Sequence, residues 1–240
     1  MNALIVGAGE MGRWFGGSIS ASIAYADFDD DTAAAAVRET GGRVVSPATE
    51  ETFDLVCLAV PMTEIGSAIE RHAVRASKAL VDVAGVMEPA VRTMRAVGPD
   101  RERLSLHPLF AGSHAPGRIA VVADRPGPIT DMLRAELTEA GNELFETTPE
   151  EHDRAMTTVQ ARAHAAILAY GLASEPVREE FHTPISAELT ALLERITDGT
   201  PRVYTDIQQA FDGADDIADA ATRLARADDN AFETLYRNAR

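Results

Sequence analysis

The chain has 240 residues and a formal net charge of −16, with 38 acidic residues against 22 lysines and arginines. This charge argues against nucleic acid or an anionic membrane surface as a partner. No stretch is long and apolar enough to cross a membrane, and the first residues already form a strand pattern, so we expect a cytoplasmic protein without a signal peptide.

Cysteine and lysine each occur once, as Cys57 and Lys78. Cys57 lies in the apolar run 54–60, so it forms no intramolecular disulfide and is expected to be a buried thiol. Arginine supplies nearly all of the positive charge. This composition reflects either a GC-rich genome or an acidic surface adapted to high salt, and the second interpretation predicts that stability rises between low and molar salt.

A glycine-rich motif follows the first apolar run, residues 3–6, and has the spacing G-x-G-x-x-G. In a dinucleotide-binding turn the three glycines allow a tight turn, close approach of a pyrophosphate, and close packing of helix on strand. Asp27 ends the next apolar run, where a carboxylate binds the adenosine ribose and repels a 2′-phosphate. We therefore expect NAD rather than NADP; the alternative is a glycine-rich turn without a ligand. The residues predicted to bind the cofactor here are Gly7, Gly9, Glu10, Met11, Gly12 and Asp27.

Short apolar runs alternate with helical stretches in the first part of the chain, which is typical of an α/β fold with a parallel sheet covered on both faces. The predicted strands span residues 3–6, 23–27, 43–45, 55–59 and 79–83, and further apolar runs span residues 104–107, 119–123 and 143–145. Ligands of such sheets bind at the carboxyl ends of the strands. Val60 and Pro61 follow the fourth run, so they either line the nicotinamide side of the site or only mark a strand exit.

The pattern changes at Thr148, a good N-cap that is followed by Pro149 at the first helical position and by Glu151, which completes a capping box. Beyond it we expect only helices, over residues 149–173, 184–197, 201–212 and one or two within 214–238. The predicted domains are a dinucleotide-binding unit, residues 1–148, and an all-α unit, residues 149–240. Helices with broad apolar faces often bury them in a homodimer interface.

His107 ends the apolar run 104–107 and is followed by Pro108 and Leu109. A histidine at the carboxyl end of a strand lies on the cofactor-binding edge of the sheet. Its imidazole can accept a hydroxyl proton during hydride transfer. The structural alternative is a histidine that satisfies the backbone of a turn.

Polar residues on the predicted helices form the next group. On a regular helix Asp153, Gln160 and His164 fall on nearly one line, which faces either a cleft or solvent. His152 and His164 lack the i, i+4 spacing of a metal-binding pair, so we expect no metal. Arg195 lies in the last turn of the helix 184–197, where it either pairs with a substrate carboxylate or complements the helix dipole.

Taken in order, the glycine motif, the block 107–112, the run 151–164, and Arg195 with residues 204–207 resemble the prephenate and arogenate dehydrogenase family of tyrosine biosynthesis. The resemblance implies a Rossmann domain followed by a helical dimerisation domain. It implies a monofunctional, NAD-dependent enzyme that decarboxylates prephenate oxidatively to 4-hydroxyphenylpyruvate, with arogenate left open as the substrate. It also implies that His107 is catalytic and that Arg195 binds a substrate carboxylate. The further substrate-facing residues would be Asp153, Gln160 and His164.

The chain departs from the family where a serine and a lysine usually follow the fifth strand, because Gly85 and Met87 stand there. An inactive, NAD-sensing dimer is therefore an alternative. A β-hydroxyacid dehydrogenase would need a lysine in its second domain, whereas Lys78 belongs to the first. A pyrroline-5-carboxylate reductase would leave the block that begins at His107 unexplained.

Overall fold

The structure, a computed structural model, describes residues 1–239. The chain divides into two compact units, Met1–Asp153 and Arg154–Arg240. The first unit ends inside the helix that the sequence predicts from residue 149, so the opening turn of this helix belongs to it.

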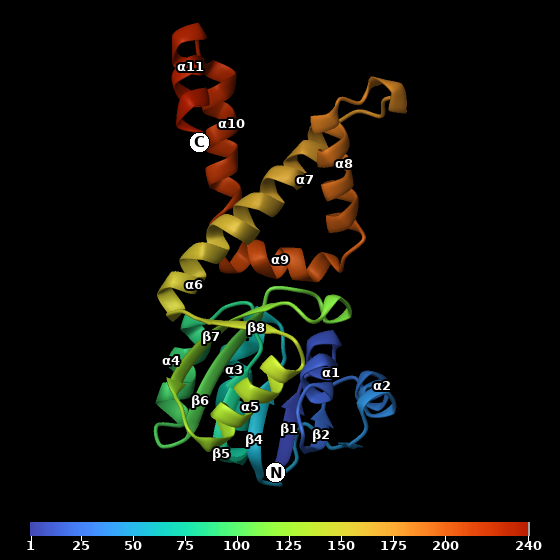
Figure 1. The fold of residues 1–240 in the computed structure, drawn as a ribbon, viewed down its shortest axis with the longest axis vertical. Helices are drawn as coiled ribbons and strands as arrows, with labels where there is room; N and C mark the ends of the chain where they lie inside the picture. The colour runs from blue at the N-terminus through green and yellow to red at the C-terminus, as the bar shows by residue number, and fades with distance from the viewer. Residues whose placement is uncertain (240) are drawn as a thin grey trace. The chain divides into compact units, whose positions relative to one another are not determined.

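The first unit is built on an eight-stranded sheet with the strand order β3-β2-β1-β4-β5-β6-β7-β8 (Figure 1). The order reverses between β1 and β4, which creates the crevice where ligands bind in sheets of this kind. All of the predicted strands are confirmed, with ends that differ by a few residues. The bounds are β1 Asn2–Val6, β2 Ser22–Ala26, β3 Arg43–Val44, β4 Phe53–Leu58, β5 Ala76–Asp82, β6 Glu102–Pro108, β7 Arg118–Arg125 and β8 Glu143–Glu146.

The predicted fold class is confirmed: the sheet is mostly parallel, with one antiparallel pair among the described strands. β7 runs antiparallel to β6, and β8 is parallel to β7. The reason is the connection between β6 and β7, residues 109–117, which is too short for a helical crossover and therefore returns the chain in the opposite direction.

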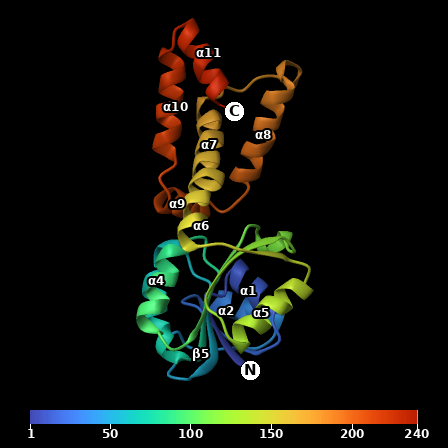
Figure 2. The same ribbon diagram turned by 60° about the vertical axis from the view of Figure 1, so that its left-hand side comes forward.

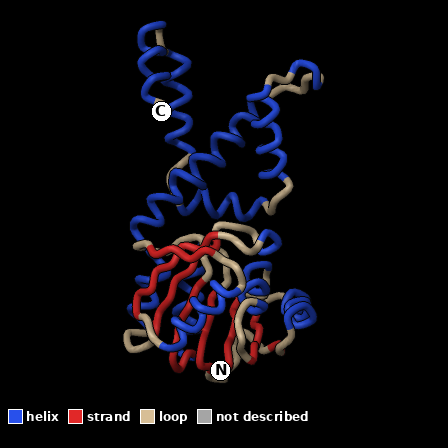
Figure 3. Tube along the Cα trace, in the orientation of Figure 1, coloured by secondary structure: helices blue, strands red, loops and turns tan. Residues whose placement is uncertain are grey.

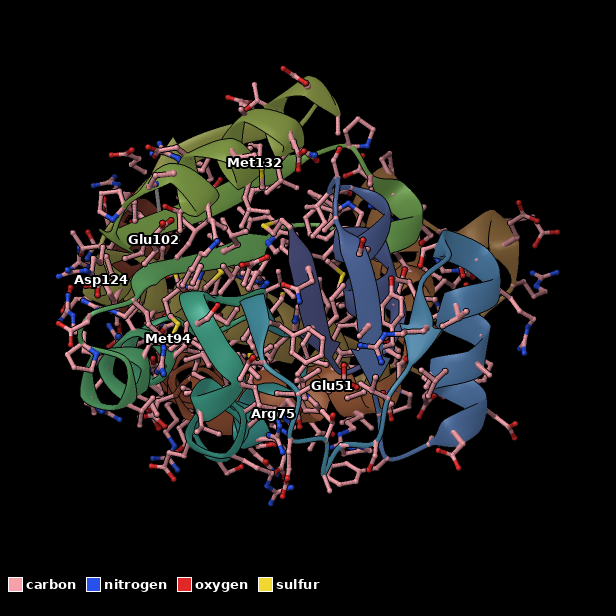
Figure 4. The ribbon with its side chains drawn as sticks, turned by 90° about the horizontal axis from the view of Figure 1, so that it is seen from below. Glu51, Arg75, Met94, Glu102, Asp124 and Met132 are labelled. Carbon is pink, nitrogen blue, oxygen red and sulfur yellow. The ribbon has the colours of Figure 1, made fainter. Side chains whose placement is uncertain are left out.

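Helices cover both faces of this sheet. Figure 2 shows α4 and α5 on opposite sides of the strands. Figure 4 looks at the unit from below and labels Met94 of α4 and Met132 of α5 on the two faces. The core on the α5 side also contains residues of α1 and α2. The bounds are α1 Glu10–Gly17, α2 Asp30–Thr40, α3 Ile65–His72, α4 Glu88–Val97 and α5 Pro128–Glu139, with short 3-10 turns η1 Met62–Glu64, η2 Ala73–Arg75 and η3 Gly112–His114.

The central strands are apolar along their whole length because helices bury both of their faces. Leu55, Val56 and Leu58 of β4 are fully buried, as is Cys57 between them. The prediction of a buried, free thiol is thus confirmed. Burial raises the pKa of the Cys57 thiol well above its usual value, so this cysteine serves packing rather than chemistry.

The second unit contains helices and, within its described residues, no strand (Figure 3). The predicted helices are confirmed, but the first contains a π-helical segment that the sequence analysis treated as regular helix. Among the described residues no helix has the length and hydropathy of a membrane span. The bounds are α6 Pro149–Met156, the π-helix η4 Thr157–Arg162, α7 Ala163–Ala173, η5 Glu179–Phe181, α8 Pro184–Thr197, α9 Pro201–Ala210, α10 Ala214–Arg226 and α11 Asp229–Asn238.

Candidate active site

The glycine motif forms the turn from β1 into α1 at the point where the strand order reverses. Gly7 has a φ of 93°, and a Cβ on it would collide with the carbonyl oxygen of Ala59. A Cβ on Gly12 would collide with the carbonyl oxygen of Gly7. Both positions therefore require glycine, for a left-handed backbone and for close helix packing.

The start of α1 is open to a ligand. Gly9 is its N-cap and has no side chain to cap the helix, and a Cβ on Gly9 would meet no atom within 4 Å. The first backbone N–H groups of the helix, including those of Glu10 and Met11, have no partner within the helix itself. Such a helix terminus beside open space fits the pyrophosphate of a dinucleotide.

Asp27 follows β2 directly and lies against the glycine turn. Its Oδ2 accepts a hydrogen bond from Ala8 N–H at 2.7 Å, and its Oδ1 accepts one from Asp29 N–H at 3.0 Å. On the other side of the turn, a Cβ on Gly7 would lie 3.3 Å from Cγ1 of Val60, which precedes Pro61 at the start of η1. The structure thus brings Asp27 and Val60 to the same turn.

Helix α1 also holds the loop that follows β6. The Glu10 carboxylate accepts a hydrogen bond from Ser113 N–H at 2.9 Å. The rings of Trp14 and Phe110 meet edge to face, with centroids 5.4 Å apart. These contacts hold the block that begins at His107 against α1, the helix that follows the glycine turn.

His107 lies near the end of β6, where it pairs with Ala120 of β7, and it is 7% exposed. Its Nδ1 is 2.8 Å from Nε2 of His152. Burial, and after it the neighbouring His152, lowers the pKa of His107 to about 3, while Asp153 opposes the change. The imidazole is therefore neutral near pH 7 and able to accept a proton.

His152 and Asp153 lie on α6 and connect His107 to α4. His152 Nδ1 is 2.7 Å from the Oδ1 atom of Asp153. From sequence, His152 is a candidate only for metal binding, because nothing local reveals a partner 45 residues away. The sequence signal that could have revealed the role of His152 is its position beside Asp153 in the run 151–164.

Gly85 lies on the other side of the His107 imidazole. A Cβ on Gly85 would lie 3.5 Å from Nε2 of His107 and 2.8 Å from the sulfur of Met62. The serine that the family resemblance leads one to expect here would reach Nε2, but glycine offers no such group. The side-chain hydrogen bond that orients His107 is therefore the one between its Nδ1 and His152 Nε2.

A second buried carboxylate, Asp82, lies at the end of β5. Asp82 pairs with Ser105 of β6, and Ser105 shares a face of the sheet with His107, which follows two residues later. Asp82 Oδ1 accepts a hydrogen bond from Ala84 N–H at 3.1 Å, whereas Asp82 Oδ2 and the Ser105 hydroxyl have no partner among the described residues. Burial raises the pKa of Asp82 to about 7.

Because folding raises the pKa of Asp82, the stability of the protein should depend on pH. The folded protein keeps a proton on Asp82 up to about pH 7, whereas the unfolded chain loses it near pH 4. Asp82 therefore lowers the unfolding free energy as pH rises between these values, by up to about 1.4 kcal/mol per pH unit. Relative to the unmodified protein, Asp82→Asn should become more stable with rising pH, as measured by urea unfolding at pH 4.5, 6 and 7.5. The exposed Asp100→Asn is the control, and a pH-independent difference for Asp82→Asn would refute the prediction.

In the second unit the structure brings His164 and Tyr204 together. His164 stacks edge to face on Tyr204, with centroids 5.0 Å apart. Gln160 Oε1 and His164 Nδ1 are buried and have no hydrogen-bond partner among the described residues. Gln160 lies in the π-helical segment, and such segments are frequent at functional sites. Arg195 is exposed in the last turn of α8, as predicted.

Comparisons with known proteins show which family this chain resembles. A family model described as the nucleotide-binding domain of prephenate dehydrogenase matches residues 18–124. The 4-amino-4-deoxyprephenate dehydrogenase of Streptomyces pristinaespiralis is 30% identical over 263 aligned residues, which cover 99% of this chain and 89% of that protein.

Solved structures share the fold. The prephenate dehydrogenase of A. aeolicus in complex with hydroxyphenyl propionate and NAD+ has a TM-score of 0.75 and 18% identity, and covers 100% of this chain and 92% of its own. Synechocystis arogenate dehydrogenase has a TM-score of 0.62 and 15% identity, with coverage of 99% and 97%. Because the likeness to a relative in sequence runs along nearly the whole chain, the chain belongs to the prephenate and arogenate dehydrogenase family of nicotinamide-dependent oxidoreductases.

Proposed function

We propose that this protein is an NAD-dependent prephenate dehydrogenase that converts prephenate to 4-hydroxyphenylpyruvate and CO2 in tyrosine biosynthesis. The observation that carries the proposal is His107, a buried, neutral imidazole at the carboxyl end of a strand in a dinucleotide-binding sheet. Such a group can take the ring hydroxyl proton at neutral pH.

The reaction requires a proton acceptor and a site that holds two carboxylates. NAD, when bound, would supply the hydride acceptor for the carbon that bears the hydroxyl. His107 accepts the hydroxyl proton through Nε2. The ring carboxylate then leaves as CO2, its bonding electrons make the ring aromatic, and the ring oxygen takes the proton back.

Residues already described would hold the two ligands. The turn at Gly7, Gly9 and Gly12 and the first N–H groups of α1 would hold the pyrophosphate. Arg195 is assigned to a substrate carboxylate, because its guanidinium fork matches a carboxylate and no ion-pair partner is found for it among the described residues. The further residues assigned to the ligands are Glu10, Met11, Asp27, Val60 and Pro61 for NAD, and Gln160 and His164 for the substrate. Asp153, which the sequence predicts to face the substrate, instead has its carboxylate hydrogen-bonded to His152, Met87 N–H and Glu88 N–H.

Cofactor preference should depend on Asp27. Its carboxylate is fixed beside the glycine turn and would repel a 2′-phosphate. Asp27→Ser should weaken NAD binding by on the order of tenfold to a hundredfold and narrow the difference from NADP, as titration calorimetry with both cofactors would measure. Asp30→Ser, at an exposed position of α2, is the control. Equal use of both cofactors by the unmodified protein would overturn the assignment.

We further propose that the protein acts as a homodimer through its second unit. α7 is almost wholly apolar, yet none of its residues is buried in the single chain, and Leu172 is 91% exposed. A helix that is apolar on all sides is normally buried, and a second copy of the chain would bury it.

Disrupting this helix should separate the two copies. Leu172→Glu places a charge where the proposed interface would exclude water, so the variant should be monomeric in light scattering while the unmodified protein is dimeric. Val74→Glu, an exposed apolar position in the first unit, is the control and should remain dimeric. A monomeric unmodified protein would contradict the proposal.

One observation favours a second substrate. Gly85 stands beside His107 Nε2, where the family resemblance leads one to expect a serine, and the family relative of 30% identity is named for 4-amino-4-deoxyprephenate. The second candidate is therefore the same reaction on 4-amino-4-deoxyprephenate.

Steady-state kinetics of the full chain with NAD test these assignments. Prephenate, arogenate and 4-amino-4-deoxyprephenate are compared by kcat/KM, and prephenate is expected to give the largest value. A preference for the amino analogue would favour the second candidate. NAD binding without turnover of any of the three would support an inactive NAD sensor and refute the proposed function.

A further inference from the structure

A continuous line of hydrogen bonds leads away from the catalytic imidazole. His107 Nδ1 lies 2.8 Å from His152 Nε2, and His152 Nδ1 lies 2.7 Å from Asp153 Oδ1. His107 and His152 are 7% and 2% exposed, so water does not compete for these contacts. The two rings meet at 76°, with centroids 5.0 Å apart.

The far end of the line is anchored on backbone donors. Asp153 Oδ1 accepts from Met87 N–H at 2.9 Å, and Asp153 Oδ2 accepts from Glu88 N–H at 3.0 Å. These groups begin α4, whose N-cap residue has no side-chain cap of its own, so a distant carboxylate performs this role. The helix dipole favours negative charge at this position. Burial would raise the pKa of Asp153, but the hydrogen bonds from His152 and the two backbone groups lower it below its usual value.

This anchor fixes the direction of each hydrogen bond. An ionised carboxylate only accepts, so His152 must donate from Nδ1. A neutral His152 then presents an unprotonated Nε2, which accepts from Nδ1–H of His107. His107 in turn carries its proton on Nδ1 and has a lone pair on Nε2.

Among the described residues, no hydrogen-bond donor is found for the Nε2 atom of His107. Gly85 is the residue beside Nε2, and even a Cβ there would lie 3.5 Å away. Among the described residues, the hydrogen bond of His107 to a side chain is the one at Nδ1. Nε2 is thus the nitrogen left for a substrate proton.

We propose that His152 and Asp153 are positioning residues that hold His107 with its proton on Nδ1 and so make Nε2 the base. This inference rests on the proposed function for its catalytic meaning, but the protonation pattern is a property of the protein alone. It also assigns Asp153 to the orientation of His107, whereas the sequence analysis assigned it to the substrate.

The protonation pattern can be measured directly by NMR of the full chain with ¹⁵N-labelled histidine, with His107 identified by the loss of its signals in His107→Asn. The unmodified protein should show His107 protonated at Nδ1 and unprotonated at Nε2 near pH 7. His152→Phe should abolish this single state and give a mixture of tautomers. His72→Phe, which alters another buried histidine of the same unit, should leave the His107 signals unchanged. A proton on Nε2 of His107 in the unmodified protein would overturn the inference without any variant.

Kinetics separate positioning from substrate contact. Asp153→Asn keeps the size of the side chain but offers one acceptor oxygen to the three donors that now meet the carboxylate. We expect kcat to fall by about 10²- to 10⁴-fold, the scale for an aspartate that orients a catalytic histidine, while KM for the substrate changes little. A raised KM with an unchanged kcat would contradict the positioning role. If the unmodified protein turns over no substrate, the proposed function fails, and the NMR result still decides the inference.

Discussion

His107→Asn is expected to lower kcat by about 10²- to 10⁴-fold, the usual contribution of a general base. Asparagine keeps a polar side chain in the buried position but cannot accept the hydroxyl proton. NAD binding should be preserved, because the glycine turn and Asp27 belong to other elements. Steady-state kinetics with saturating NAD measure the effect, and His72→Asn controls for the loss of a buried histidine.

The pH dependence of kcat in His107→Asn is a second test of the same role. Burial lowers the pKa of His107 to about 3, so the base is protonated only in acid and is available through the neutral range. The acidic limb of kcat in the unmodified protein should be missing in His107→Asn. A variant with near-normal kcat would mean that the base lies elsewhere in the protein.

Arg195→Ala is expected to raise KM for prephenate by on the order of tenfold to a hundredfold, because a charge-assisted pair with a carboxylate is worth roughly 1.5–3 kcal/mol. Arg195 is an exposed side chain in the last turn of α8. The affinity for NAD should barely change, since the residues assigned to NAD all lie in the first unit.

A matched control distinguishes this role from that of a helix-end cation. Arg223 occupies the last turn of α10 and is also exposed, so Arg223→Ala removes the same charge from an equivalent helical position. If Arg195 only complements its helix dipole, both variants lose up to about 1 kcal/mol of stability and keep their KM. An unchanged KM in Arg195→Ala would leave the substrate carboxylate without an assigned partner.

Much of the fold could be predicted because its signals are local. Runs such as residues 55–59 are apolar throughout, which indicates a strand buried on both faces, and Thr148 with Pro149 marks the start of a helix. The glycine motif and the block at His107 are also contiguous in sequence. Their resemblance to the prephenate and arogenate dehydrogenase family is confirmed by the comparisons.

The features that escaped prediction depend on distant contacts. The antiparallel direction of β7 follows from a short connection that was not distinguished from a crossover. His152 acquires its partner, His107, only when α6 packs beside the end of β6. The π-helical segment at residues 157–162 shifts the side chains away from the regular helical line on which Gln160 and His164 were placed. Local helix and strand propensities do not reveal any of these three features.

The proposed function requires that hydride and carboxylate leave the same ring in one reaction. The most direct measurement follows NADH formation by absorbance and CO2 release from carboxyl-labelled prephenate in the same incubation of the full chain with NAD. We predict that NADH and CO2 appear in equal amounts and that both are lost in His107→Asn. NADH without matching CO2, or no NADH at all, would contradict the proposed function.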